Sequence, residues 1–195
     1  MPLSKPDGRE LLHARDITIR GYRRSDGRYD IEAHLVDTKS FSFPNEDRGT
    51  IPAGEPLHDM WVRLTVDEDL TITASEAATV HGPYAICPGA APGFARLAGL
   101  KIGRGFLRAA AERVGGVGGC THLRELLQQL GTTAIQTLYA VRVRKEEPRE
   151  ARARPPAMLN TCYAYAADGP VVRRRWPEFY TGPDRLPVAS EADDA

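Results

Sequence analysis

The sequence lacks three features that would place it in a broad functional class at once: an excess of one charge, a long hydrophobic run and a paired set of cysteines. Its 195 residues include 26 basic and 26 acidic side chains, and the formal net charge is zero. Nucleic acid and anionic membranes are therefore not expected as partners. No apolar run approaches the roughly 20 residues that cross a bilayer, and the first residues lack the apolar core of a secretion signal. We expect a cytoplasmic protein.

Cysteine is scarce and its count is odd. Cys87, Cys120 and Cys162 lie far apart, which makes a poor disulfide framework, and in a reducing compartment they stay as thiols. The apolar content of 42% is ordinary for a folded domain and too high for a wholly disordered chain. The length allows one domain with a hydrophobic core. The chemistry to be explained is therefore that of a few thiols and histidines in a neutral globular protein.

The first half of the chain shows the two-residue periodicity of β-strands, with apolar residues on one face and polar residues on the other. The pattern predicts strands from residue 15 to a turn at 25–27, over 28–40, over 57–66 and over 70–74, with a loop at 41–55.

The second half changes to helical periodicity, and glycines separate its segments. The pattern predicts a short helix at about 93–98, a second over 104–114 and a long helix over 121–143. The predicted fold class is therefore α+β, an antiparallel β-meander followed by packed helices.

The composition also predicts how the chain is divided. Residues 1–14 read as a loose lead-in and 15–143 as a single α+β domain, followed by a charged linker at 144–156 and a disordered acidic tail at 183–195. The segment 157–182 is expected to pack back on the domain. Its β-forming residues at 158–166 and 171–180 either return to the sheet or cover a pocket.

Candidate site residues gather where predicted elements begin or end. His58 has the parity of Met60 and therefore faces the core at the start of its strand. Cys87 lies where the strands give way to helices, and Cys120 opens the long helix. The separations of 29 and 33 residues match no zinc-finger spacing, so buried apolar thiols remain an alternative to metal ligands. His122, in the first turn of the long helix, is either a surface residue or a further ligand.

Two resemblances to known families include these residues. The strings PAGEPLHDMWVRLTVDEDLTI, ICPGAAPGFARLAGLKIGRGFLRAA and GGCTHLRELLQQL resemble the U-type iron–sulfur scaffold (NifU and IscU-like) family over about residues 50–143. The resemblance implies a similar fold with converging ligands at His58, Cys87 and Cys120. The family has cysteine at the first of these positions, and it has histidine where this chain has Gly119. One imidazole and two thiolates suit Zn²⁺ or a single Fe better than a transferable cluster.

A second resemblance covers nearly the whole chain. The strings RGYRRSDGRYDIEAHLVDTK, AGEPLHDM, GFLRAAAERVGGVGGCTHLRELL and NTCYAY are similar to a bacterial family catalogued as domain of unknown function 2889. That family brings no established activity, and it implies the same order of sheet and helices.

Together these patterns predict a metal-binding protein that acts as a metal-dependent enzyme, a lyase or hydrolase, on a small-molecule ligand. His58, Cys87 and Cys120 are the expected ligands of a divalent Zn or Fe. Asp59 is expected as fourth ligand or as the acceptor that orients His58, and Asp59 and His122 are the candidate catalytic residues. Two alternatives stay open: an iron–sulfur or metal-handling accessory protein that docks a partner enzyme, and a non-catalytic ligand-binding domain whose thiols belong to the core.

Overall fold

The computed structural model describes residues 3–145, 155–156 and 158–183. The chain divides into two compact units, residues 1–145 and 146–195. The strands of the first unit are β1 (His13–Arg23), β2 (Tyr29–Lys39), β3 (Phe43–Asn45), β4 (Gly49–Ile51), β5 (Pro56–Val66) and β6 (Ile72–His81). Its helices are the 3₁₀ helices η1 (Cys87–Leu97) and η2 (Gly116–Gly118) and the α-helices α1 (Phe106–Val114), α2 (Thr121–Thr137) and α3 (Tyr139–Lys145).

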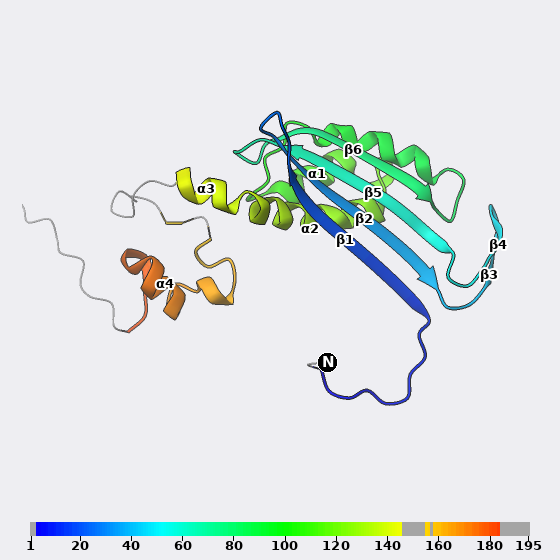
Figure 1. Ribbon diagram of the computed structural model, residues 1–195, viewed down its shortest axis with the longest axis horizontal. Coiled ribbons are helices and arrows are strands. Elements are labelled where there is room, and N and C mark those ends of the chain that lie inside the picture. The colour runs from blue at the N-terminus through cyan, green and yellow to red at the C-terminus, as the bar shows by residue number, and fades with distance from the viewer. Residues whose placement is uncertain (1–2, 146–154, 157, 184–195) are drawn as a thin grey trace, which may run out of the picture. The chain divides into compact units, whose positions relative to one another are not determined.

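The main sheet is an antiparallel meander in the order β1-β2-β5-β6 (Figure 1). Alternation gives β2 a buried face and a half-buried face: Ile31, Ala33 and Leu35 are fully buried, and the residues between them are half-buried. β1 and β2 join through a tight turn at Gly27, whose φ of 82° favours glycine. β3 and β4, which lie between β2 and β5 in the sequence, form a separate two-stranded hairpin.

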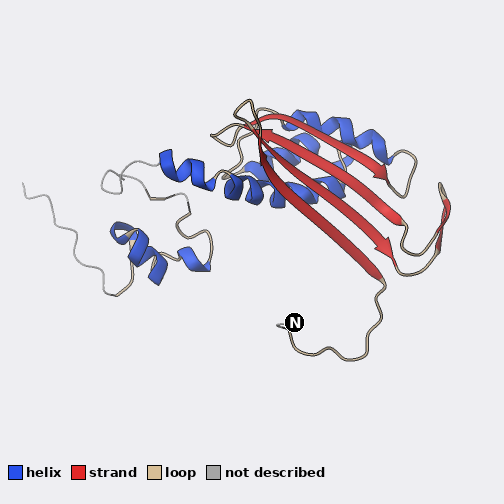
Figure 2. Ribbon diagram, viewed as in Figure 1, coloured by secondary structure: helices blue, strands red, loops and turns tan. Residues whose placement is uncertain are grey.

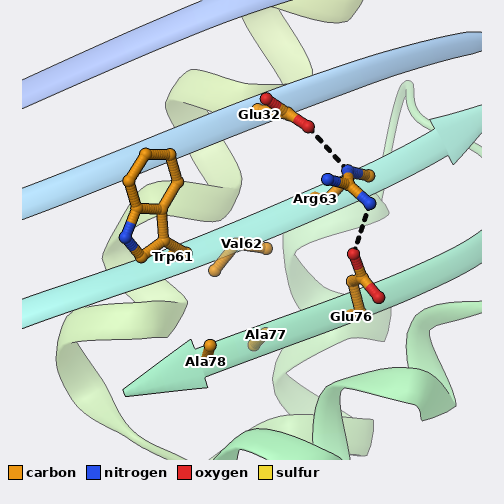
Figure 3. Close-up of a pocket in the computed structure, with 7 residues that line it drawn as sticks. All are labelled: Glu32, Trp61, Val62, Arg63, Glu76, Ala77 and Ala78. Atoms are coloured by element: carbon orange, nitrogen blue, oxygen red, sulfur yellow. Dashed lines mark hydrogen bonds and ion pairs between the residues drawn. The ribbon is translucent and has the colours of Figure 1, made fainter. Parts of the chain in front are cut away.

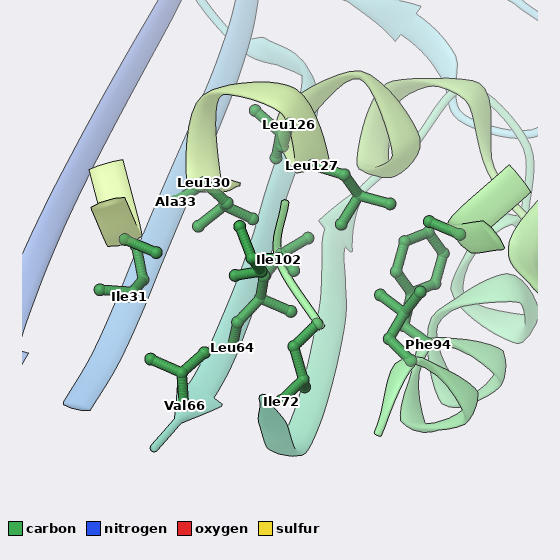
Figure 4. Packing of buried hydrophobic residues seen from close by; sticks show 14 of the residues in the cluster. Ile31, Ala33, Leu64, Val66, Ile72, Phe94, Ile102, Leu126, Leu127 and Leu130 are labelled. Atoms are coloured by element: carbon green, nitrogen blue, oxygen red, sulfur yellow. The ribbon is translucent and has the colours of Figure 1, made fainter. Parts of the chain in front are cut away.

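η1, α1 and α2 cover one face of this sheet (Figure 2). α2 presents an apolar stripe to the strands, and Figure 4 shows Leu126, Leu127 and Leu130 among the buried residues of the core that Ile31 and Leu64 also form. Phe94 of η1 extends the same core and is fully buried. The layers are thus one sheet and one helical layer, with a core between them and an open second sheet face.

The predicted fold class is confirmed: an antiparallel four-stranded sheet is followed by helices. Several details differ. The long helix predicted over 121–143 is interrupted at Leu138, where φ −90° and ψ 0° separate α2 from α3. The loop predicted at 41–55 contains the β3–β4 hairpin, and the last strand continues to His81 instead of ending near residue 74. Cross-strand pairing decides such boundaries, and local periodicity does not report it.

The second unit has helical turns in its described residues: η4 (Tyr163–Tyr165), α4 (Pro170–Arg175) and η5 (Pro177–Phe179). Val172, Trp176 and Tyr180 form its small apolar cluster. Of the two alternatives for 158–166 and 171–180, the return to the sheet is wrong, because described residues 158–183 form no strand, and the covering of a pocket stays a prediction. Pro170 in the first turn fits a helix start, where its missing N–H costs no hydrogen bond.

Most of the predicted linker at 144–156 and of the predicted acidic tail at 183–195 lies outside the described residues. The packing of 157–182 onto the first unit stays a prediction. Among the described residues, no helix has the length and apolar character needed to cross a membrane.

Candidate functional site

Two buried polar side chains of the first unit, those of Asp37 and His58, meet at one end of the main sheet. Here β2 ends and β5 begins, and the pairing of these strands places Asp37 opposite His58. Both side chains face the helical layer: Asp37 is 1% exposed and His58 is 7% exposed. The register shifts directly after Asp37, and such an irregularity re-aims side chains at a strand end. The first residues of β1 and of α2 border the same place.

Asp37 is held by three hydrogen bonds. Arg15 of β1 donates from Nε to Oδ1 at 2.7 Å and from Nη2 to Oδ2 at 2.8 Å, a bidentate pair. His58 donates from Nδ1 to Oδ2 at 2.9 Å. Arg15 also donates from Nη1 to Glu125 of α2 at 2.8 Å, which ties the sheet edge to the helix. Burial raises the pKa of Asp37, but hydrogen bonding and charge from Arg15 outweigh it, so the pKa lies below its ordinary value.

His58 is held neutral at the same place. Burial, followed by the neighbouring His122, lowers its pKa below the ordinary value of 6.5. Asp37 opposes this shift in the pKa of His58, and the positive charge of Arg15 adds to it. The Nδ1–H of His58 is committed to Asp37, and Nε2 has no hydrogen-bond partner among the described residues. The His122 ring lies against the His58 ring with a centroid distance of 3.9 Å and a tilt of 34°.

This arrangement predicts how stability depends on pH. Because the folded pKa of His58 lies below 6.5, the unfolded chain takes up the proton first as the pH falls. The free energy of unfolding of metal-free protein should therefore decrease from about pH 6.5 downward and level off below the folded pKa. Urea titrations in EDTA at several pH values measure this slope. His58→Gln should flatten it, and an equal slope in the variant would contradict the prediction.

A cavity of about 770 Å³ opens beside the two histidines, within the range of small-molecule sites. Its lining brings together His58, Cys87, Cys120 and His122, four of the five residues predicted for the site. Among the described residues, the one group with ligand atoms all within 4.8 Å of one another is Asp37, His58 and His122. The two thiols therefore share the cavity with the histidines but do not complete such a group with them.

Glycines and two arginines shape the wall from which Cys120 projects. A Cβ on Gly119 would lie 1.9 Å from the carbonyl oxygen of Val114, so only glycine lets this loop pack against the end of α1. Arg96 donates to the carbonyl oxygens of Gly118 at 2.8 Å and Arg113 at 3.0 Å. Arg113 donates back to the carbonyl oxygen of Arg96 at 2.7 Å. These hydrogen bonds between Arg96 and Arg113, which we call the arginine clasp, hold the loop 115–119 and the start of α2 in place.

The β3–β4 hairpin contacts the segment 84–86, which lines another part of the cavity. The Asp47 side chain, in the turn between β3 and β4, accepts a hydrogen bond from the Ala85 amide at 2.6 Å. Ala85 stands between Tyr84 and Ile86, which line the cavity mouth. The hairpin therefore contacts the segment that forms one lip of the cavity.

Asp59 does not lie beside His58. Alternation along β5 places it on the outer sheet face, where it accepts a hydrogen bond from His34 Nε2 at 2.8 Å, and His81 lies 4.0 Å away. The expectation that Asp59 ligates a metal with His58 or orients His58 is corrected by this geometry, because Asp37 occupies that position. His34 is also stacked on Trp61, with 3.8 Å between ring centroids.

The outer face has a smaller hollow of about 300 Å³ around Trp61 (Figure 3). Its charged groups satisfy one another, since Arg63 bridges Glu32 and Glu76 across three strands. The charged side chains that line this hollow are thus paired with one another. The helix-side cavity is the better candidate site.

The residues that the sequence did not point to are Asp37 and Arg15. A signal was present for Asp37: it continues the alternation of Ile31, Ala33 and Leu35, which makes it a carboxylate on a core face. No local signal marks Arg15 as its partner, since that contact depends on the pairing of β1 with β2.

Comparison with known proteins gives one match. The model of the family described as "Protein of unknown function (DUF2889)" matches residues 13–136, which cover the main sheet and nearly all of α2. No curated protein and no solved structure matches the chain significantly. The resemblance to U-type iron–sulfur scaffolds therefore stays a prediction from sequence pattern.

Proposed function

The chain belongs to the family of proteins of unknown function DUF2889, a membership that brings no activity, so we propose from the cavity itself that the protein is a metal-dependent enzyme acting on a small molecule. The metal is a divalent Zn or Fe held by His58 and His122. Cys87 and Cys120 line the same cavity, and their thiols become further ligands by moving toward the histidines when the metal binds. Hydrolase and lyase chemistry are the classes that such a site serves.

One observation carries the proposal: a buried imidazole is presented with its Nδ1 held by a carboxylate and its Nε2 free. Carboxylate–histidine pairs of this kind orient metal-binding imidazoles and raise their basicity. Here Asp37 fills the carboxylate position and His122 supplies a second imidazole with ligand atoms within 4.8 Å. Both oxygens of Asp37 accept hydrogen bonds from Arg15, so Asp37 suits the orienting role better than direct ligation.

The donor types around the cavity suit Zn²⁺ and Fe²⁺. Imidazole nitrogen and thiolate sulfur are the common ligands of these ions, whereas Mg²⁺ and Ca²⁺ require oxygen ligands. When bound, such a metal polarises a carbonyl group or lowers the pKa of a bound water to about 7. The protein's own contribution is a cavity of about 770 Å³ in which a substrate can lie against His58 and His122.

Metal analysis tests the proposal. Full-length protein purified without a histidine tag should contain about one equivalent of Zn or Fe by elemental analysis. His58→Gln and His122→Gln should each lose most of it, and Asp37→Asn should weaken metal affinity by about 10–100-fold, the usual effect of removing an orienting partner. Cys87→Ser and Cys120→Ser should reduce occupancy as well.

Matched controls come from the same chain. His34→Gln removes an imidazole paired with Asp59 on the outer sheet face, and Cys162→Ser removes the exposed thiol of the second unit. Both should keep wild-type metal content. Substoichiometric Zn and Fe in wild-type protein, before and after reconstitution, would refute the metal site, as would equal losses in target and control variants.

An open coordination position separates an enzyme from a structural or accessory site. Co²⁺-substituted protein should show visible bands that shift with pH and with added azide, because an exchangeable water occupies the open position. Bands insensitive to both would indicate a closed structural site and contradict the catalytic proposal. Strong sulfide-to-iron absorption after anaerobic reconstitution would instead favour the accessory alternative.

A further inference from the structure

β1 forms one edge of the main sheet, and its outer side has no backbone partner among the described residues (Figure 1). We propose that β1 pairs antiparallel with β1 of a second copy of this chain, which joins two four-stranded sheets into one. The pairing is centred on Thr18, which faces its own counterpart. Ile17 then lies opposite Ile19 of the second copy, and Asp16 lies opposite its Arg20. This surface is separate from the cavity, and the proposal does not rest on the proposed function.

The two edges of the main sheet differ in how they are protected. At the β6 edge, the Gly99 amide donates to the Ile72 carbonyl oxygen at 2.7 Å, and the Ile72 amide donates to the Leu100 carbonyl oxygen at 2.8 Å. The β1 edge has 11 residues, contains no proline and pairs with β2 without a bulge. A long and regular edge of this kind presents a row of hydrogen-bonding groups to another strand.

The hydrogen bonds to β2 show which backbone groups of β1 point outward. In an antiparallel pair, hydrogen bonds join residues directly opposite each other and use every second residue. At one end of the pairing, the Ser40 amide donates to the Leu12 carbonyl oxygen, and at the other end the Arg24 amide donates to the Arg28 carbonyl oxygen. Even-numbered residues of β1 therefore bond to β2. The odd-numbered residues of 13–23 direct their N–H and C=O groups to the open edge.

The side chains of β1 fit a second copy of the same strand. Ile17 and Ile19 are half-buried against the core, and facing one another across the edge would cover the rest of their apolar surface. On the outer face, Asp16 and Arg20 are exposed, and neither has an ion pair or a side-chain hydrogen bond among the described residues. They lie two residues before and two residues after Thr18, so an antiparallel copy brings each opposite its complement.

Charge complementarity selects this register over its neighbours. The outward groups of the odd-numbered residues restrict the pairing to registers in which odd residues face odd residues. In the two adjacent registers of this kind, Asp16 would face Thr18 or Tyr22. Arg20 would face Ala14 or Thr18, so neither charge would meet an opposite one. The register centred on Thr18 makes two Asp–Arg pairs, at positions without backbone hydrogen bonds, where facing side chains are closest.

Sedimentation equilibrium of the full-length protein tests the pairing. Wild-type protein should form a dimer with a Kd in the micromolar range, as expected for a small interface made by one pair of strands. Asp16→Arg and Arg20→Asp should each weaken dimerisation by at least about tenfold, because each change replaces two attractive pairs with two repulsive pairs. Both side chains are exposed, so the fold should tolerate either change.

Mixing the two variants tests the register itself. Equimolar Asp16→Arg and Arg20→Asp proteins should form a heterodimer at least as stable as the wild-type dimer, because both facing pairs are again opposite in charge. Protein that carries both changes in one chain should also dimerise like wild type. The controls Asp69→Arg and Arg104→Asp make the same changes of charge at exposed positions outside β1 and should leave dimerisation unaltered.

Hydrogen exchange locates the contact on β1. The amides of Ile17 and Ile19 should exchange at least about tenfold more slowly in the dimer than in diluted protein, whereas the Thr18 amide, which bonds to β2, should change less. Wild-type protein that stays monomeric up to about 1 mM would overturn the proposal. So would a dimer that neither single reversal weakens, or single variants that stay monomeric when they are mixed.

Discussion

Replacing Asp37 with alanine should lower the free energy of unfolding by about 2–3 kcal/mol. Removing one partner of a buried ion pair typically costs about 3–5 kcal/mol, because the remaining charge is left without compensation. The value is reduced here because the Arg15 side chain is 32% exposed and keeps its contact with Glu125. The Nδ1–H of His58 also loses its acceptor.

The measurement is urea unfolding followed by tryptophan fluorescence. Because the chain has two tryptophans, one in each unit, a Trp176→Phe background leaves Trp61 to report the sheet unit alone. The control is Glu32→Ala, which removes a carboxylate bound to Arg63 on the outer sheet face and should cost no more than about 1 kcal/mol. Similar losses in both variants would contradict the burial of the Asp37 network.

Phe94→Ala should lower the free energy of unfolding by about 3–5 kcal/mol, more than Asp37→Ala does. Phe94 is fully buried, and its ring fixes η1 to the core between the sheet and α2. Truncation removes the transfer free energy of the ring and leaves a cavity that the tightly packed surroundings fill only in part. A loss of this size would leave little of the stability of an average domain.

The same fluorescence assay measures this prediction. Leu107→Ala is the matched control, since Leu107 lies on α1 with 44% of its surface exposed and should cost less than about 1 kcal/mol. Because η1 begins at Cys87, Phe94→Ala should also disturb the cavity wall and reduce metal occupancy. Equal unfolding energies for the two variants would contradict the placement of Phe94 in the core.

The sheet was predictable because its signal is local. Alternation over 28–40 and 57–66 predicts β2 and β5 to within two residues, and it places His58 on the core face, as observed. The same alternation excludes Asp59 from the neighbourhood of His58, since adjacent residues of a strand point to opposite faces. It also marks Asp37, the residue that takes the place expected of Asp59.

The remaining features depend on contacts between distant segments. Arg15 reaches Glu125 across 110 residues, and no local pattern reports such a pairing. The arginine clasp of Arg96 and Arg113 uses backbone carbonyl groups, which leave no mark on side-chain periodicity. In the second unit, β-forming residues near Val172 adopt helical turns, because their own cluster around Trp176 overrides local propensity.

The hydrogen bond between Asp47 and Ala85 connects the entrance of the cavity to a turn whose sequence can change at little cost in stability. Turn residues of an exposed hairpin tolerate substitution and changes of length better than strands do. Since this hairpin contacts the lip that includes Tyr84 and Ile86, sequence drift in the turn would reshape the entrance while His58 and its carboxylate partner stay fixed in the sheet. For protein engineers, residues 45–49 are therefore the segment to randomise when a library of altered ligand preference is wanted.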